Sequence, residues 1–515
     1  MDELERDADY KKQSKALVYA AFVAGLCSIV YELLIATTVS YFVGDSVTYF
    51  SLTIGMYMAA MGGGSFCSKF IGEKLVDYFL LLEILLAAIG GLSVPLLYLA
   101  YTYGGLFMPT YVVTTLLVGF LIGMEIPFLT RLMESFQSLK VNIAHILSLD
   151  YVGALIATLA FPFFLLPVFG NYLSSLILGV VNLSIVMIVF ICFKSRKLAL
   201  AHLIKSGLFI VFAILLLGIV LSQTLLERWD QSLFNDRIVH AEQTHYQKVI
   251  ITKNEDDIRL YLNGNIQFSS VDEYRYHEAL IHFPIAYKST SVRRVLLLGA
   301  GDGLAVKQLL KYPKIDEIVL VDLDPKIVEI AKTNPHLHKL NNGSLYDERV
   351  TTIASDALVY LENNRVKFDL IVTDLPDPNN LSLTRLYSKY FYHLARQNLS
   401  DDGVFVTQAT SPYYATKAFW SIVNTIESAQ FKYVIPYHAQ VPAFGDWGFV
   451  MAVKTHGALL ENSKLTVETQ FVTEETIPTM TVFPKDIVFL SAKINRLDRP
   501  VLLDYYLEGW RSHGY

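Results

Sequence analysis

Cysteine and charged residues are both scarce in this chain of 515 residues. The three cysteines, Cys27, Cys67 and Cys192, lie in apolar segments, and none has CxxC spacing, so they predict neither a disulfide framework nor a zinc site. Charged residues make up 17% of the chain, the net charge is −6, and no long basic run occurs. Nothing therefore indicates a nucleic-acid partner. The first apolar segment is too long for a signal-peptide core, so we expect no cleaved leader.

Apolar residues are in excess, at 53% of the chain with a mean hydropathy of +0.40. The excess lies before about residue 226, where seven segments are long enough to cross a bilayer, which takes about 20 residues each. We predict a membrane all-α bundle of about seven helices over 16–225, after a cytoplasmic N-terminal segment, 1–15. The expected spans are 16–40, 47–68, 76–100, 107–130, 143–168, 172–193 and 204–225.

Lysine and arginine occur only in alternate loops of this half. Because cytoplasmic loops are enriched in these residues, we expect a multi-pass protein of the cell membrane with its N-terminus in the cytoplasm. Seven spans would then place the following domain outside, whereas an eighth crossing or a re-entrant segment would place it inside. The basic residues are Arg6, Lys11, Lys12 and Lys15; Lys69 and Lys74; Arg131 and Lys140; and Lys194, Arg196, Lys197 and Lys205.

Four acids interrupt the expected spans: Glu32, Glu83, Glu125 and Asp150. Ionisable side chains are costly in hydrocarbon, so each is a candidate for a functional site. One hypothesis is a path for cationic amines lined by carboxylates. The other is that these side chains lie near helix ends or hydrogen-bond within the bundle and hold its helices in register.

The second half has the patterns of a soluble protein. Alternating apolar residues from Arg237 to about Phe268, with the hairpin signal Asn263-Gly264, predict a small antiparallel β domain. A helix is expected over Val271–Tyr287. We assign 226–290 to the β domain and linking helix, 291–455 to an α/β Rossmann-like domain, and 456–515 to a C-terminal extension of unknown role.

A glycine-rich turn organises the α/β domain. The apolar run Val295–Leu298 ends at Gly299-Ala300-Gly301-Asp302-Gly303, and a second run ends on Asp322. Strand, glycine turn, helix, strand and acid form the first half of a doubly wound nucleotide fold. A third glycine is missing from its usual place, and the Asp302 carboxylate would repel a pyrophosphate. We therefore expect a cationic nucleoside without phosphates, such as an S-adenosyl sulfonium compound.

Acids recur where the later strands of this domain end. They are Asp302, Asp322, Asp356 and Asp374, with Asp377 one turn beyond the last. Open α/β sheets bind ligands at the carboxyl ends of their strands, so a cluster of acids there indicates ligands that are cationic or rich in donors. Any single one could instead be a helix N-cap or turn residue.

These motifs resemble the spermidine synthase family, also called polyamine aminopropyltransferases. The resemblance covers about residues 237–455 through GAGDG, VLVDLD, SDA, DLPDP, LYSKYFY, THYQ, NGNIQ and DEYRYHE. The apolar spans, with DLPDP and QATSPYYATKAFW, resemble its multi-pass membrane branch. The resemblance implies a methyltransferase-type fold, a homodimer, and no metal or resident cofactor. The implied reaction moves an aminopropyl group from decarboxylated S-adenosylmethionine, the co-substrate, to a diamine such as putrescine. The products would be spermidine or a related polyamine and methylthioadenosine.

The resemblance also implies roles for individual residues. Asp374 would be the general base, helped by Tyr276, and Asp302 would hold the donor's ammonium. The expected donor-binding residues are Gln247, His277, Gly299, Gly301, Asp302, Asp322 for the ribose hydroxyls and Asp356 for the adenine amino group. The expected acceptor-binding residues are Gln267, Tyr276, Asp377, Phe444 and Trp447. Tyr276 could instead be a core aromatic residue and His277 a surface histidine, and Tyr246 and Gln408 are left open.

The sequence departs from the family at Phe444, where the family commonly has a tyrosine. The lost hydroxyl leaves the identity of the acceptor open. Asp446 and Trp447 could compensate, because an acid and an aromatic face both suit a cation.

The acids favour aminopropyl transfer over methyl transfer. A methyltransferase must accommodate the carboxylate of methionine, which Asp302 and Asp374 would repel, whereas the decarboxylated donor presents only an ammonium. Alkyl amines have a pKa near ~10.4, so the acceptor needs a base to remove its proton. The alternative is a polyamine transporter or sensor with a ligand-binding domain, but binding a cation requires no such base.

Overall fold

The computed structural model divides the chain into two compact units, Met1–Asn235 and Asp236–Tyr515, and each is described by itself. The first unit ends later than the expected span boundary at residue 225, because its last helix continues to Leu233. Arg196 and Lys197, which contribute to the predicted orientation, lie outside the described residues. The structure describes residues 3–43, 46–102, 105–136, 138–194, 198–288, 291–455, 463–489 and 491–513.

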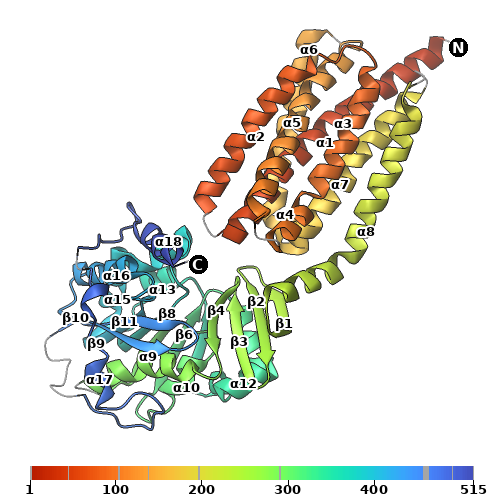
Figure 1. Ribbon diagram of the computed structural model, residues 1–515. Coiled ribbons are helices and arrows are strands. Elements are labelled where there is room, and N and C mark those ends of the chain that lie inside the picture. The colour runs from red at the N-terminus through yellow and green to blue at the C-terminus, as the bar shows by residue number, and fades with distance from the viewer. Residues whose placement is uncertain are drawn as a thin grey trace. The chain divides into compact units, whose positions relative to one another are not determined.

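The first unit is a bundle of helices (Figure 1). All seven segments expected to span are helical, and the third is divided into α3 and α4 before Pro95. Gly170, with φ of +66°, interrupts the helical geometry at the start of α7. The helices are α1 (Glu3–Val43), α2 (Ser46–Ser68), α3 (Leu75–Gly91), α4 (Ser93–Thr102), α5 (Phe107–Met133), α6 (Leu139–Ala160), η1 (Phe161–Leu165), α7 (Leu166–Cys192) and α8 (Ala201–Leu233).

Five helical stretches within the described residues have the length and composition to cross a membrane. Leu139–Cys192 covers two of the segments expected from the sequence, and the segment 47–68, now α2, is not among the five. The others are Asp9–Val43, Leu75–Thr102, Phe107–Met133 and Ala201–Leu233.

The second unit begins with the predicted antiparallel sheet. Its order is β1-β2-β3-β4, and Asn263 and Gly264, with φ of 50° and 82°, form the hairpin turn between β3 and β4. The expected helix follows as α9 (Glu273–Tyr287). The strands are β1 (Arg237–Gln243), β2 (Lys248–Asn254), β3 (Asp257–Leu262) and β4 (Asn265–Ser269).

A seven-stranded sheet forms the centre of this unit, in the order β10-β11-β9-β8-β5-β6-β7 (Figure 1). Strands β5 to β9 are parallel, and β11 is antiparallel to both β9 and β10. The two apolar runs expected before and after the glycine turn are β5 and β6, whereas β10 was not predicted. The strands are β5 (Arg294–Gly299), β6 (Glu317–Asp322), β7 (Val350–Ala354), β8 (Phe368–Asp374), β9 (Leu399–Gln408), β10 (Tyr433–Val441) and β11 (Gly445–Val453).

Alternate residues of the central strands pack into two separate cores. Leu297 and Val372 belong to the core beneath α9 and α10, whereas Leu298 and Ile371 belong to the core beneath α15 and α16. The strand order reverses between β5 and β8, which sets the expected ligand position at their carboxyl ends. The flanking helices are α10 (Leu304–Leu309), α11 (Pro325–Thr333), α12 (Pro335–Asn341), α13 (Ala357–Asn363), α14 (Leu381–Thr384), α15 (Lys389–Asn398) and α16 (Thr416–Ser428).

The C-terminal extension packs onto the second unit. Its helices are α17 (Thr476–Thr479) and α18 (Leu502–Ser512). The Glu278 carboxylate of α9 accepts hydrogen bonds from the backbone N–H groups of Gln470, Phe471 and Val472. Leu502 of α18 is fully buried in the core beneath α16. The extension is therefore an integral part of this unit.

Candidate active site

The glycine turn lies close to two of the predicted acids. Gly299 ends β5 with φ of +83°, and a Cβ there would lie 2.1 Å from the backbone oxygen of Asp374. A Cβ on Gly301 would lie 2.7 Å from Oδ2 of Asp322, which accepts the Gly301 N–H at 3.1 Å. Only glycine permits these approaches, because any side chain would collide with its neighbour. The turn therefore lies between Asp322 and Asp374.

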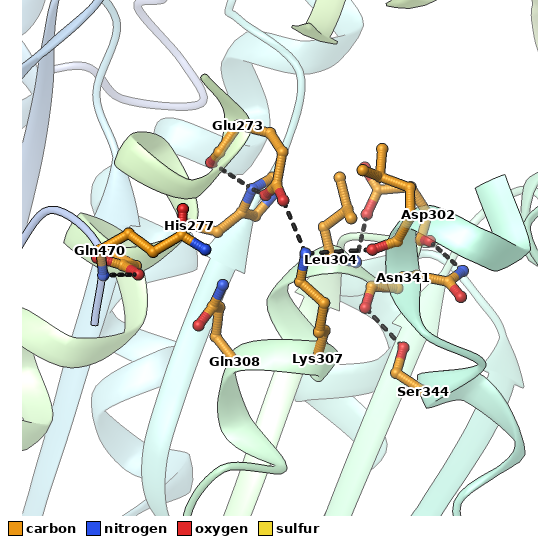
Figure 2. A network of polar contacts seen from close by, with 12 residues as sticks. Glu273, His277, Asp302, Leu304, Lys307, Gln308, Asn341, Ser344 and Gln470 are labelled. Atoms are coloured by element: carbon orange, nitrogen blue, oxygen red, sulfur yellow. Dashed lines mark hydrogen bonds and ion pairs between the residues drawn. The ribbon is translucent and has the colours of Figure 1, made fainter. Parts of the chain in front are cut away.

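Asp302 is fixed within this turn (Figure 2). Its carboxylate accepts the N–H of Leu304 at 2.9 Å, and its backbone carbonyl accepts from the Asn341 amide at 2.9 Å. The Ser344 hydroxyl donates to the Gly303 carbonyl at 2.7 Å. Burial raises the pKa of Asp302 to about 6, with the charge of Asp374 adding to the effect and His277 opposing it. The surroundings thus stabilise the ionised carboxylate poorly, as suits a group that binds a cation.

Asp374, at the end of β8, is paired with Tyr276 of α9. The Tyr276 hydroxyl donates to Oδ1 of Asp374 at 2.6 Å. Burial and the charge of Asp374 raise the pKa of Tyr276 well above 10, so the phenol stays a donor at neutral pH. Burial also raises the pKa of Asp374, against the opposing effects of His277 and Tyr276. The predicted base and its helper therefore contact each other directly.

His277 is buried and ion-paired, so the alternative of a surface histidine is wrong. Its Nδ1 lies 2.8 Å from the Glu273 carboxylate, and Lys307 donates to the other carboxylate oxygen at 2.7 Å (Figure 2). Burial alone would lower the pKa of His277, but the hydrogen bond and charge of Glu273, with Asp302 and Asp374, raise it to about 9. Burial opposes the ionisation of Glu273, yet His277 and Lys307 lower its pKa to about 2. A positive imidazolium therefore lies near both Asp302 and Asp374.

The predicted ribose ligand, Asp322, lies beside an acid that the sequence analysis missed. Asp322 accepts the N–H of Asp324 at 2.9 Å, and burial raises its pKa to about 6. Asp324 caps α11 and accepts from the Gln247 amide at 3.0 Å and the Thr244 hydroxyl at 2.7 Å. Gln247 is thus tied to the end of β6. The Asp-Pro pair that starts a helix was a visible signal for this cap.

Asp356 is a helix N-cap. It accepts the N–H groups of Leu358 at 3.0 Å and Val359 at 3.2 Å, and its second oxygen pairs with Arg385. The N-cap interpretation is therefore confirmed, while the adenine contact stays a prediction.

Asp377 lies among donors from the end of β9 and the residues that follow it. It accepts from the Gln408 amide at 3.3 Å and the Thr410 hydroxyl at 3.1 Å. Burial raises the pKa of Asp377 to about 6, and nearby Tyr506 of α18, Thr410 and Gln408 oppose the rise. Gln408, which the sequence left open, thus lies with the expected acceptor carboxylate. Tyr506 lies in the extension to which the sequence assigned no role.

Phe444 and Trp447 lie together near Tyr276, the predicted helper of the general base. The Phe444 ring is 6.0 Å from the Tyr276 ring and 5.1 Å from that of Trp447, between centroids. Asp446 instead pairs with His438 of β10 at 2.6 Å, because neighbouring residues of a strand point to opposite faces. Trp447 therefore lies next to Phe444 while Asp446 is held by His438, and compensation for the lost hydroxyl stays a prediction.

Gln267, a predicted acceptor-binding residue, and Tyr246, whose role the sequence left open, both belong to the β domain. The Gln267 amide donates to the carbonyl of Asn265, its neighbour on β4, at 3.1 Å, and among the described residues no bond links it to the acids. Tyr246 is 49% exposed.

Known proteins are similar to this chain over most of its length. Residues 273–464 match the spermine/spermidine synthase domain family. The chain is 37% identical to a polyamine aminopropyltransferase of Leptospira interrogans, over 96% of this chain and 98% of that protein. It is 38% identical to polyamine aminopropyltransferase 1 of Streptomyces coelicolor, over 96% of this chain and 95% of that protein. A crystal structure of a spermidine synthase in complex with the transition-state analogue AdoDATO covers 49% of this chain and 87% of its own, with 23% identity and a TM-score of 0.45.

Proposed function

Because this chain belongs to the polyamine aminopropyltransferase family, we propose that it transfers the aminopropyl group of decarboxylated S-adenosylmethionine to putrescine or a similar amine. The products are spermidine or a related polyamine and methylthioadenosine. The observation that carries this assignment is the Tyr276–Asp374 hydrogen bond at the centre of a group of strand-end acids. Such a group suits a reaction between two cations.

Asp302 and Asp322 form the donor side of the site. The Asp302 carboxylate binds the ammonium of the aminopropyl group, and Asp322 accepts hydrogen bonds from the ribose hydroxyls. Their pKa values of about 6 leave both mainly ionised at pH 7 and above. His277, as an imidazolium, favours the ionised form of Asp302 before the substrate arrives. It also limits the repulsion between Asp302 and Asp374.

Asp374 and Asp377 form the acceptor side. The acceptor nitrogen attacks the methylene carbon next to the sulfonium; the new C–N bond forms as the C–S bond breaks. The sulfur keeps the electron pair and becomes a neutral thioether, and the nitrogen loses a proton to Asp374. The raised pKa of Asp374 makes its carboxylate a stronger base, and Tyr276 holds that carboxylate in place. Asp377 binds the distal ammonium.

Product analysis tests this function. Purified protein is incubated with decarboxylated or intact S-adenosylmethionine and with putrescine, a longer diamine or spermidine. We expect methylthioadenosine from the decarboxylated donor, and a new polyamine that identifies the acceptor. S-adenosylhomocysteine from the intact donor would indicate methyl transfer instead. If neither product forms and the protein still binds amines, the function of a transporter or sensor would be favoured instead.

We also propose that the first unit is embedded in the cell membrane as a multi-pass bundle with its N-terminus in the cytoplasm. Large apolar side chains on α8, including Phe209 and Val220, are 73% and 70% exposed, as suits contact with lipid. The alternating loop charges favour an outside location for the second unit. Protease added to sealed right-side-out vesicles would then degrade the second unit. Degradation only in inverted vesicles would place the second unit on the cytoplasmic side.

A second candidate function, polyamine transport, rests on acids buried in the bundle. Glu83 of α3 and Glu125 of α5 are both buried, and the Asn182 amide of α7 donates to Glu83 at 3.0 Å. Asn182 is fully buried as well. This bond between α3 and α7 fits a role in holding the helices in register as well as it fits a path for amines. Glu32 and Asp150 are only half-buried.

A homodimer is the expected assembly, as the family resemblance implies. Light scattering of the detergent-solubilised protein measures it directly, and a monomeric mass would contradict it.

A further inference from the structure

The buried carboxylate of Asp324, just beyond the end of β6, is joined to the turn between β1 and β2. That turn, 244–247, is closed by a hydrogen bond from the Thr244 N–H to the Gln247 carbonyl at 2.8 Å. Oδ2 of Asp324 accepts from the Gln247 amide at 3.0 Å and from the Thr244 hydroxyl at 2.7 Å. Asp324 is only 2% exposed, so water competes little for these bonds. One carboxylate oxygen thus holds the turn of the small sheet against the end of a parallel strand.

The backbone of the same residue bonds to the proposed ribose ligand. The Asp324 N–H donates to Oδ1 of Asp322 at 2.9 Å, and the Gly301 N–H donates to Oδ2 at 3.1 Å. Each oxygen of the Asp322 carboxylate therefore has one backbone donor and keeps a lone pair for a ligand. Asp324 thus contacts two predicted donor-binding residues, Asp322 through its main chain and Gln247 through its side chain.

The Asp324 carboxylate decides which way round the Gln247 amide lies. A side-chain amide donates from its nitrogen end and accepts at its oxygen end, whereas an ionised carboxylate only accepts. The other groups that bond to this carboxylate are also donors, the Lys326 N–H on Oδ1 at 3.1 Å and the Thr244 hydroxyl on Oδ2. The nitrogen end of Gln247 therefore points to Asp324, and its oxygen end is left for another partner.

An oxygen is the end of the amide that the proposed donor substrate requires. Decarboxylated S-adenosylmethionine carries an ammonium, a sulfonium, ribose hydroxyls and an adenine amino group, which are positive or can donate hydrogen bonds. The nitrogen end of Gln247 would oppose such groups with a second donor, whereas the oxygen end accepts from them.

We propose that Asp324 is a positioning residue for donor binding, which turns the oxygen of Gln247 towards the donor and holds Asp322 for the ribose hydroxyls. This proposal rests on the proposed function and names the residue that orients its donor side. Asp324 acts through its two neighbours and does not touch the substrate.

The first test is Asp324→Asn in the full chain. Asparagine is also a preferred N-cap, so α11 should keep its start. A nitrogen in place of Oδ2 would face the nitrogen of Gln247, so the Gln247 amide must rotate and present its donor end to the substrate. We expect the KM for the decarboxylated donor to rise about tenfold, a typical loss for one hydrogen bond. The acceptor KM should stay within about twofold, and kcat should change little.

A second variant at this position guards against a rotated asparagine. Asp324→Ser also supplies a good N-cap, but its side chain is one bond shorter and does not reach Gln247. It should raise the donor KM by a similar factor. The matched control is Asn334→Asp, which exchanges an amide and a carboxylate at the N-cap of α12, where Asn334 accepts the N–H groups of His336 and Leu337. This control should leave the donor KM unchanged.

Exchanging the two side chains separates positioning from general damage. Gln247→Glu alone places two carboxylates face to face and should raise the donor KM. Combined with Asp324→Asn, it restores a donor opposite an acceptor: the new amide at position 324 donates to the new carboxylate at position 247, which keeps an oxygen for the substrate. The double variant should therefore recover most of the donor KM that either single change loses. A merely structural role predicts losses that add.

Three results would overturn the proposal. They are an unchanged donor KM in both Asp324→Asn and Asp324→Ser, an equal rise in Asn334→Asp, and a double variant no better than Asp324→Asn.

The proposed function is judged on the parent protein alone. If the parent forms no methylthioadenosine with any amine, that function fails, and the role of Asp324 is then measured by calorimetric binding of the decarboxylated donor. Asp324→Asn should still weaken this binding about tenfold relative to Asn334→Asp. Equal binding by the two variants, or no binding by the parent, would reject the positioning role.

Discussion

The Tyr276 hydroxyl donates a 2.6 Å hydrogen bond to Oδ1 of Asp374. Tyr276 comes from the helix that follows the small β domain, and Asp374 from the end of the fourth parallel strand in chain order, β8. The bond therefore joins α9 to the parallel sheet at the carboxylate that we propose as the general base. Burial raises the pKa of this carboxylate, and the hydrogen bond limits the rise.

Replacing each partner of this bond tests the base. Asp374→Asn should lower kcat about 10²–10⁴-fold, the usual contribution of a general base, with little change in donor KM. Tyr276→Phe should have a smaller effect and should move the acid limb of the kcat profile to higher pH. The reason is that the pKa of Asp374 rises when it loses a donor. Methylthioadenosine release measured between pH 5.5 and 9 checks both, and turnover by Asp374→Asn as fast as the parent would reject Asp374 as the base.

We expect the Asp302 carboxylate to lower the stability of the protein while it contributes to donor binding. Its pKa is raised from 3.8 to about 6 in the folded chain, so its favourable contribution to stability is present below about pH 4 and lost as pH rises through 6. At pH 7.5 the ionised group destabilises the unliganded protein. Asp302→Asn should therefore stabilise it by on the order of 1–2 kcal/mol, and the amide oxygen can still accept the Leu304 N–H.

The same variant should lose donor affinity, because an amide does not neutralise an ammonium. Thermal unfolding followed by tryptophan fluorescence and donor KM measured on the same preparation give both quantities. If Asp302→Asn had a lower unfolding midpoint than the parent at pH 7.5 and a higher one at no pH above 6, the ionised Asp302 carboxylate would not be destabilising.

The strand-end acids were predictable because their signals are local. A glycine turn after an apolar run, and acids after later runs, specify β5, β6 and β8 and the edge where they end. The Glu273–His277 ion pair was also visible, since residues four apart on a helix face each other. Strand alternation likewise separates Asp446, which pairs with His438, from Trp447, which lies beside Phe444.

The contribution of the extension could not be obtained in this way. The helix α18 joins the rest of the unit through the packing of Trp510 against Tyr414 and the anchoring of Asn495. These contacts join segments far apart in the chain, and no local period or turn signal encodes them. Strand β10 was missed for a related reason: Pro436 lies within it, and a proline in a run argues against a strand unless it lies at a sheet edge, as β10 does.

The buried acids of the bundle give a prediction that separates structure from transport. Glu83→Gln keeps a hydrogen-bonding side chain next to Glu125 and Asn182, so the bundle should assemble normally. Glu83→Leu leaves the Asn182 amide without its carboxylate partner and should lower the yield of folded protein. If the acids only hold the helices together, Glu83→Gln retains both aminopropyl transfer and any amine uptake into vesicles. Loss of uptake with transfer intact would favour the amine path.

The His277–Glu273 pair predicts how stability depends on pH. His277 has its pKa raised from 6.5 to about 9, so its contribution is fully present below about pH 6.5 and is lost as pH rises through 9. Glu273 has its pKa lowered from 4.5 to about 2, so its contribution is present above about pH 4.5 and lost only in strong acid. Stability from this pair should therefore fall by about 2–3 kcal/mol between pH 6.5 and 9.5.

His277→Gln should remove this slope, because glutamine carries no proton that is lost on the alkaline side. His282→Gln is the matched control: His282 is also buried on α9, but its pKa is lowered to about 4, so it is neutral across the whole window. The control should lower stability by a similar amount at every pH, through its lost bonds to Tyr312 and Gln308, and keep the parent's slope. Unfolding midpoints from tryptophan fluorescence at pH 6.5, 8 and 9.5 distinguish the cases. A slope that persists in His277→Gln would mean that another group loses the proton, and the imidazolium beside Asp302 and Asp374 would have to be abandoned.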